Sequence, residues 1–406
     1  MIKSLVLFIS ICGVSLSSCR EQPEKVVTVP FRLDHNRMLV EGEMQKKDGT
    51  WRKVLFWVDP GNPSFILSKP LADDLRDEVI SLRKEGNVDA RNPVPVSVRI
   101  GGKLMDFRDV NPYILSEPFW LFSTMHIDAN LPSVVLKRYQ VVFDYPERQL
   151  SIGDSGSMIH RGIRNTALVH PETGIVQMDA IIDKGVFSFA LDNGASYSFM
   201  TGAMVDSLII RNPGWPAIAG TAGCANMWGW WPPEIQPFLV LRIPEVKWGN
   251  TDLTQVGIVG VPDSSLGGIS MGAWYSRKTV KPVDGFLGAN ALKSFRVEID
   301  YPDNAVYFEK GTDKEGFDMD IVGLAVSPQR DSSYLVIGIT QKNHKPLVEG
   351  IIPGDKLIQI DRLTVKGATM GSVVDALRGK PGEVRKLLIE RGGKQIKVDV
   401  RVERIL

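Results

Sequence analysis

One local construction occurs twice in this chain of 406 residues and constrains its fold more than any other feature. In each copy an apolar segment leads to an aspartate, a glycine follows two positions later, and a second apolar segment reaches a hydroxyl residue suited to cap a helix. The two copies are Val54–Ser68, with Asp59 and Gly61, and Phe187–Thr201, with Asp192 and Gly194. Glycine permits the sharp turn, but a carboxylate at the end of a buried strand is energetically costly. A single Asp-Asn-Gly is an ordinary turn signal, whereas its repetition indicates a duplicated unit.

A second repeated landmark supports the duplication. Leu136–Pro146 and Leu292–Pro302 both end in Asp-Tyr-Pro, and each predicts a strand, a tight turn and a returning strand. Repeats of this length indicate duplicated domains rather than solenoid units. We therefore predict a mostly β, two-lobed body, with a first, degenerate lobe at 26–156 and a second lobe at 157–311.

The composition excludes several classes of function. The net charge is +1, with 43% hydrophobic and 23% charged residues, which is ordinary for a soluble globular protein and gives no reason to expect nucleic-acid binding. The five histidines, at positions 35, 126, 160, 170 and 344, lack the spacing of metal ligands. We therefore predict no metal site and no cofactor.

The N-terminus indicates export. Lys3 precedes an apolar run over 5–14 that is too short to span a membrane, and Leu16-Ser-Ser-Cys19 follows it. This segment resembles the bacterial lipobox, which implies a lipoprotein signal peptide at 1–19 and lipidation of Cys19. The expected location is the bacterial cell envelope, lipid-anchored and facing the periplasm or the outer membrane. A simple secretory signal with an incidental cysteine remains the alternative, and Cys224 is more typical of a small buried residue than of a nucleophile.

The C-terminal unit, 312–406, has a different pattern. A Pro-Gly turn precedes a strand within 350–361, a helix is predicted over 368–378, and a hairpin crosses Gly392-Gly393. The segment resembles a bacterial PDZ domain, an α+β fold. The resemblance implies a carboxylate-binding loop for a peptide C-terminus at Gly323, Leu324, Ala325 and Val326, beside a helix face with Val373 and Leu377.

The duplicated Asp-x-Gly turns resemble those of aspartic peptidases, pepsin-like in having both β-barrel lobes on one chain. The second unit also resembles the retropepsin-like group. The resemblance implies that Asp59 and Asp192 form the catalytic pair. It also implies a supporting set around their turns, which consists of Gly61, Asn193, Gly194, Ala195, Phe286, Leu287 and Gly288.

The function implied by this resemblance is an exported, lipid-anchored aspartic endopeptidase that acts on peptides or unfolded proteins. Two carboxyl groups about 3 Å apart share a proton, which suits them to acid–base chemistry. The family usually has Thr or Ser where this chain has Pro60 and Asn193, and Gly where it has Pro132. One alternative is therefore an inactive peptide-binding scaffold of the same family, and another is the pairing of second lobes from two chains.

Two further segments are candidates for function. An insertion rich in Trp, Pro and Gly over 213–237, with Trp228, Trp230 and Trp231, predicts either a flap over a cleft or a loop packed on itself. Gly268-Ile-Ser270-Met-Gly272 matches the nucleophile elbow of serine hydrolases. That motif requires a following helix and a later histidine. The residues after Ser270 do not predict a helix, so the sequence favours the carboxylate pair over a serine nucleophile.

Overall fold

The computed structural model describes residues 25–76, 97–115, 126–220, 238–261, 271–275, 277–312 and 318–405. Within these residues the protein is mostly β, as the sequence predicts. The helices are short: α1 Lys69–Arg76, α2 Ser133–Leu136, α3 Gly202–Arg211, α4 Met271–Tyr275, α5 Ala289–Leu292 and α6 Met370–Leu377. No helix in the described part of the chain is both long and apolar enough to cross a membrane.

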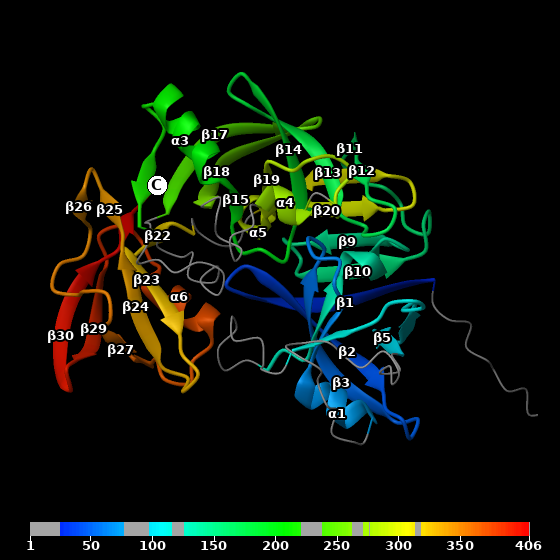
Figure 1. Cartoon of the computed structure of the whole chain (residues 1–406), viewed down its shortest axis with the longest axis horizontal. Helices are drawn as coiled ribbons and strands as arrows, with labels where there is room; N and C mark the ends of the chain where they lie inside the picture. Colours follow the sequence, from blue (N-terminus) through cyan, green and yellow to red (C-terminus); the bar gives the residue numbers. More distant parts are fainter. Residues whose placement is uncertain are drawn as a thin grey trace, which may run out of the picture.

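A 13-stranded sheet contains the strands of the first predicted unit and three strands of the second. Its members are β1 Val26–Asp34, β2 Arg37–Gln45, β3 Trp51–Asp59, β4 Ile66–Ser68, β5 Val98–Ile100, β6 Lys103–Met105, β7 Tyr113–Leu115, β8 Ala129–Pro132, β9 Gln140–Asp144, β10 Gln149–Gly153, β11 Ile163–Thr166, β20 Phe295–Asp300 and β21 Ala305–Lys310. The two units meet where β20 pairs antiparallel with β9, from Arg296 opposite Asp144 to Asp300 opposite Gln140 (Figure 1). The sheet is therefore continuous across both units.

A 10-stranded sheet contains the remaining strands of the second unit. Its members are β12 Leu168–Val169, β13 Val176–Ile182, β14 Gly185–Asp192, β15 Ser198–Thr201, β16 Ala217–Ala219, β17 Leu239–Trp248, β18 Thr251–Val261, β19 Gly285–Gly288, β25 Gln341–Lys342 and β26 Lys345–Pro346. The last two come from the C-terminal unit and join through Gln341, which pairs with Ala219.

The C-terminal unit forms a six-stranded sheet with α6 beside it, seen in orange and red in Figure 1. Its strands are β23 Leu324–Pro328, β24 Tyr334–Ile339, β27 Lys356–Ile360, β28 Leu363–Thr364, β29 Val384–Arg391 and β30 Lys394–Arg401. A separate pair joins β22 Asp320–Ile321 to β31 Glu403–Arg404. The apolar residues of this unit form one continuous cluster with residues of the second unit such as Tyr197, Phe199 and Phe286.

Several local predictions are confirmed. The Asp-Tyr-Pro turns lie between β9 and β10 and between β20 and β21, and both tyrosines, Tyr145 and Tyr301, are buried. Thr201 caps α3, and its hydroxyl accepts a hydrogen bond from the Met204 amide at 3.4 Å. Gly392 and Gly393, with φ of 57° and 77°, form the turn between β29 and β30. The domain boundaries themselves remain a prediction.

The described core allows a direct test of packing. Trp248 exposes 0% of its surface, packs against Phe308 with ring centroids 5.4 Å apart, and donates from Nε1 to the Met178 carbonyl at 3.3 Å. We expect Trp248→Ala to lower the free energy of unfolding by about 3–5 kcal/mol, because it opens a cavity and removes the hydrogen bond from the indole to the Met178 carbonyl. Chemical denaturation measures this effect, and Ile210→Ala, at a side chain 78% exposed, is the control. Equal midpoints for the two variants would contradict this packing.

Candidate functional site

Asp59 and Asp192 occupy equivalent places in the two units. Each ends a strand, β3 or β14, that pairs in parallel with a short strand, β8 or β19. In this register Asp59 lies opposite Pro132 and Asp192 lies opposite Gly288. The repeated sequence therefore builds the same local structure twice, and Pro132 occupies the place of Gly288.

The structure brings the two turns together. A Cβ placed on Gly61 would lie 2.2 Å from Cγ of Asp192, and one placed on Gly194 would lie 2.3 Å from Oδ1 of Asp59. The two aspartates expose only 3% and 8% of their surface. Each turn therefore packs against the carboxyl group of the other unit, and only glycine fits at either contact.

The two carboxyl groups differ in their hydrogen bonds. Oδ1 of Asp192 accepts from the amides of Gly194 at 3.0 Å and Ala195 at 3.2 Å, and the Gly61 amide also hydrogen-bonds to this carboxyl group. Asp59 instead receives side-chain amides, from Asn130 at 3.5 Å and from Asn62. The first loop thus stabilises its carboxylate less strongly than the second.

Burial governs the protonation of the pair. Loss of solvent raises the pKa of Asp192 to about 6, although the amides of its own turn lower it. The pKa of Asp59 is raised well above its ordinary value, first by burial and then by the negative charge of Asp192. Burial therefore disfavours the charged form of both groups, and the two carboxyl groups titrate as a coupled pair.

Two residues beside the pair were not identified from the sequence. Arg37 is 2% exposed, its guanidinium lies 5.8 Å from the ring centroid of Trp57, and its charge acts on both Asp59 and Asp192. Burial lowers the pKa of Arg37 to about 10, so it is cationic at neutral pH. Tyr275 is half-buried; the loss of solvent around its hydroxyl raises its pKa, and the charges of both aspartates raise it further. Neither residue belongs to a recognisable motif.

The residues predicted to support the turns lie around them. Phe286 stacks on Phe199 with ring centroids 4.9 Å apart and contacts Tyr275 at 4.5 Å. Leu287 and Asn193 are fully buried. The Gly288 amide donates to the Ser198 hydroxyl at 3.0 Å.

Other predicted site residues lie away from the pair or outside the described residues. Gly323, Leu324, Ala325, Val326, Val373 and Leu377 are all buried, at the start of β23 and on α6. Trp228, Trp230 and Trp231, together with Cys19, Cys224 and Ser270, lie outside the described residues. Helix α4 begins directly after Ser270, so the prediction that no helix follows this serine is wrong. Across the described ranges, no group of three or more His, Cys, Asp or Glu side chains is arranged to hold a metal ion.

Comparison with known proteins gives one informative match. The "Probable CtpA-like serine protease" of Staphylococcus saprophyticus subsp. saprophyticus is 26% identical over 121 residues, which are 29% of this chain. The match spans 25% of the length of that relative. No family model matches the chain.

This finding corrects the class predicted from the sequence. The assignment to aspartic, pepsin-like or retropepsin-like peptidases is wrong, because the relative is a serine protease, in which a hydroxyl group is the nucleophile. Two predicted functions, the aspartic endopeptidase and the inactive peptide-binding scaffold of the same family, depended on that assignment and are therefore also wrong. The physical reason is that an Asp-x-Gly turn specifies a backbone geometry and the position of a carboxyl group, not the attacking group.

The close contact at Gly61 yields a prediction. Gly61→Ala places a methyl group within 2.2 Å of Cγ of Asp192, so one turn must move away from the other. We expect the free energy of unfolding to fall by about 1–3 kcal/mol. Gly214→Ala is the matched control, because a Cβ there meets no atom within 4 Å. Thermal melts measure both variants, and an unchanged Gly61→Ala protein would disprove the contact.

The raised pKa of Asp192 yields a second prediction. The folded state holds this proton up to about pH 6, whereas the unfolded chain releases it near 3.8. The contribution of Asp192 to stability is therefore greatest below the unfolded value and is lost as the pH rises toward 6. A difference of one between the folded and unfolded pKa corresponds to about 1.4 kcal/mol of stability. We expect denaturation from pH 4 to 7 to show this loss in the natural protein and a smaller loss in Asp192→Asn. Parallel profiles for the two proteins would contradict it.

Proposed function

We propose that the protein is a peptidase that acts on peptides or on unfolded segments of exported proteins. The observation that carries this proposal is the buried pair Asp59 and Asp192, whose pKa values are both raised and which lies at the contact between two repeated units. The protease name of the relative supports the same general activity. Neither aspartate is needed to complete a strand. The free-energy cost of burying both carboxyl groups is therefore better explained by a role in the reaction.

The role we assign to the pair is proton exchange. Hydrolysis of a peptide bond requires one group that takes a proton from the nucleophile and another that gives a proton to the leaving amine. A coupled pair of carboxyl groups with raised pKa values, in which one group can hold a proton while the other is ionised, offers both. The cation Arg37 favours the ionised form of both carboxyl groups in their buried surroundings. The relative favours a serine hydroxyl as the attacking group.

The C-terminal unit is proposed to bind the C-terminus of a peptide, as its PDZ-like sequence implies. β23 is the first strand in the order of its sheet, so one of its edges pairs with no other strand of that sheet. Gly323 precedes this strand, and Val373 and Leu377 lie on α6 beside it. Lipidation of Cys19 would hold the protein at the cell envelope, which is the proposed location.

The experiment is a cleavage assay on the chain from residue 20 to residue 406. The protein is incubated with a mixed peptide library from pH 4 to 8, and the products are identified by mass spectrometry. We expect cleavage that falls by about 10²–10⁴-fold in Asp192→Asn. Asp252→Asn, which alters an exposed carboxylate on β18, is the matched control and should retain activity.

A fluorophosphonate probe and the Ser270→Ala variant test the class of nucleophile. Labelling that disappears in Ser270→Ala, together with loss of cleavage, would assign the nucleophile to that serine. Activity that survives both the probe and Ser270→Ala would exclude it. Absence of cleavage at every pH, with an unchanged circular dichroism spectrum, would refute the peptidase proposal.

A further inference from the structure

The indole of Trp57 reaches from the first unit to the second Asp-x-Gly turn. Its Nε1 donates a hydrogen bond to the Gly194 carbonyl at 3.2 Å, between residues 137 positions apart. Trp57 stands two positions before Asp59 on β3, so the two side chains lie on the same face of that strand. Phe56 and Val58, on the other face, are fully buried in the core. The face of β3 that carries Asp59 therefore also carries a donor to the opposite turn.

The carbonyl that accepts this hydrogen bond belongs to a peptide group that also binds Asp192. The Gly194 carbonyl and the Ala195 amide are the two ends of one planar peptide group. The amide end donates to Oδ1 of Asp192 at 3.2 Å, and the carbonyl end accepts from Trp57. Hydrogen bonds in a chain polarise one another, so the bond accepted by the carbonyl strengthens the bond donated by the amide. The indole therefore acts on the carboxyl group through a single peptide group.

The repeat supplies a comparison within the chain. The residue two positions before Asp192, equivalent to Trp57, is Ala190, and a methyl group donates no hydrogen bond. The indole therefore supports the turn of Asp192, and the second unit offers no matching donor from this position to the turn of Asp59. The hydrogen bonds of the pair agree with this difference, because backbone amides bind Asp192 whereas side-chain amides bind Asp59.

The Trp57 ring is held by apolar contacts and by a cation. The half-buried ring packs against a small apolar cluster of Leu39 and Ile127, and Leu39 lies opposite it on β2. The Arg37 guanidinium lies 5.8 Å from the ring centroid. A ring fixed in this way presents its N–H in one direction, which is the property that a supporting side chain needs.

Arg37 belongs to the turn between β1 and β2, which is buried although turns usually lie at the protein surface. The four residues Asp34–Arg37 each expose no more than 3% of their surface. Nδ2 of Asn36 donates to the Ser196 carbonyl at 3.1 Å, one residue beyond Ala195. The first unit therefore holds this loop at two points, once from β3 and once from the β1–β2 turn.

The β1–β2 turn is itself fixed by the C-terminal unit. Oδ1 of Asp34 accepts a hydrogen bond from the Gly371 amide at 2.9 Å, at the start of α6. Oδ2 of Asp318 accepts from Nδ2 of Asn36 at 3.1 Å, and its Oδ1 accepts from Nη2 of Arg378 at 2.8 Å, at the end of α6. The turn therefore has a fixed position, and so has the guanidinium that it places beside the indole.

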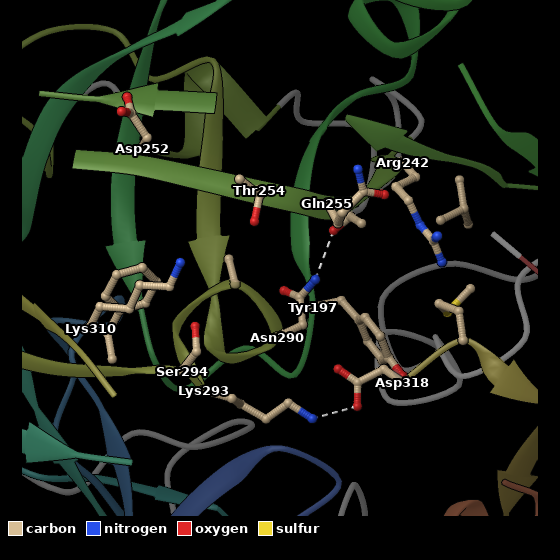
Figure 2. A pocket seen from close by; sticks show the side chains of 15 residues that line it. Tyr197, Arg242, Asp252, Thr254, Gln255, Asn290, Lys293, Ser294, Lys310 and Asp318 are labelled. Carbon is tan, nitrogen blue, oxygen red and sulfur yellow. Dashed lines mark hydrogen bonds and ion pairs between the residues drawn. The ribbon is translucent and has the colours of Figure 1, made fainter. Parts of the chain in front are cut away.

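The far end of the loop is also held by the second unit. The Asn290 amide donates to the Ser196 carbonyl at 3.3 Å. Figure 2 shows Asn290 and Tyr197 in the wall of a pocket, together with the ion pair of Lys293 and Asp318. The residues that line this pocket lie between positions 197 and 319. The peptide group bound by the indole is therefore the part of the loop that depends most on the first unit.

We propose that Trp57 is a positioning residue of the carboxyl pair: its indole N–H orients the Gly194–Ala195 peptide group so that the amide stays directed at Asp192. The chain of hydrogen bonds from indole to carboxylate follows from the contacts alone. Its meaning for catalysis rests on the proposed peptidase function. A measurement on the resting protein separates the two.

The first experiment removes the indole N–H. Trp57→Phe keeps an aromatic ring without a donor. Replacement of Trp57 by β-(3-benzothienyl)alanine exchanges only the N–H for sulfur and keeps the shape of the side chain, so it tests the hydrogen bond without opening a cavity. The matched control is Trp51→Phe at the start of β3, where the Arg99 guanidinium lies 4.1 Å from the ring centroid. Circular dichroism verifies that each variant is folded.

Two properties are measured by NMR: the pKa of Asp192 in selectively ¹³C-labelled protein, and the amide proton shift of Ala195. The titratable and charged groups that act on Asp192 are the same in all variants, namely Asp59, Arg37, Tyr145 and Tyr275.

Hydrogen bonds to an ionised carboxyl group lower its pKa, and the Ala195 amide makes one of those that lower the pKa of Asp192. We therefore expect both changes at Trp57 to raise the pKa of Asp192 from about 6 by a further ~0.5–1. The Ala195 amide proton should move upfield, as for a weakened hydrogen bond. Trp51→Phe should change neither property. A pKa and an amide shift that are unchanged in the benzothienyl variant would overturn the proposal.

The second experiment measures cleavage of one peptide that the natural protein cuts. We expect kcat to fall about tenfold in the benzothienyl variant with KM unchanged, and the rise of kcat with pH to move upward by the same amount as the pKa of Asp192. A raised KM with unchanged kcat would assign Trp57 to substrate binding and overturn the positioning role. A shifted pKa in a protein that cleaves no peptide would support the chain of hydrogen bonds and refute the peptidase function.

Discussion

The contact of each Asp-x-Gly turn with the carboxyl group of the opposite unit is the constraint on which the rest of the structure depends. Two buried acids so close together cannot both ionise, so the folded chain must hold a proton and supply a cation. Burial raises the pKa of both carboxyl groups, and the charge of Arg37 acts in the opposite direction on each. Gly61 and Gly194 allow the approach, because a single added carbon would separate the turns.

The pair is only as rigid as the contact between the two units. The pairing of β9 with β20 makes one sheet of both, and the buried tyrosines of the Asp-Tyr-Pro turns pack at its ends. One of them, Tyr145, lies close enough to the second Asp-x-Gly turn for the charge of Asp192 to act on its hydroxyl group. The repeated turns at the two ends of each unit therefore support each other across the sheet. This arrangement explains why a duplicated chain retains both landmarks.

The C-terminal unit is integrated with this body rather than tethered to it. Its apolar residues continue those of the second unit, and α6 is held at both ends by the β1–β2 turn of the first. A unit packed in this way can act on the carboxyl pair through contacts that already exist. The C-terminal unit would then influence peptide hydrolysis through its contacts with the rest of the protein, and not only by recruiting substrate.

The sequence by itself determined the features that depend on neighbouring residues: the β-rich repeat, the Asp-Tyr-Pro hairpins, the cap at Thr201 and the α6 helix. Local periodicity and turn chemistry encode these features. Only the tertiary structure decided that Arg37 and Tyr275 surround the pair and that a polar turn is buried. Asn36 and Ser196 are 160 positions apart, and Asp34 and Gly371 are 337 apart. Contacts at such separations leave no local pattern, and neither does the identity of a nucleophile, which is why the predicted peptidase class was wrong.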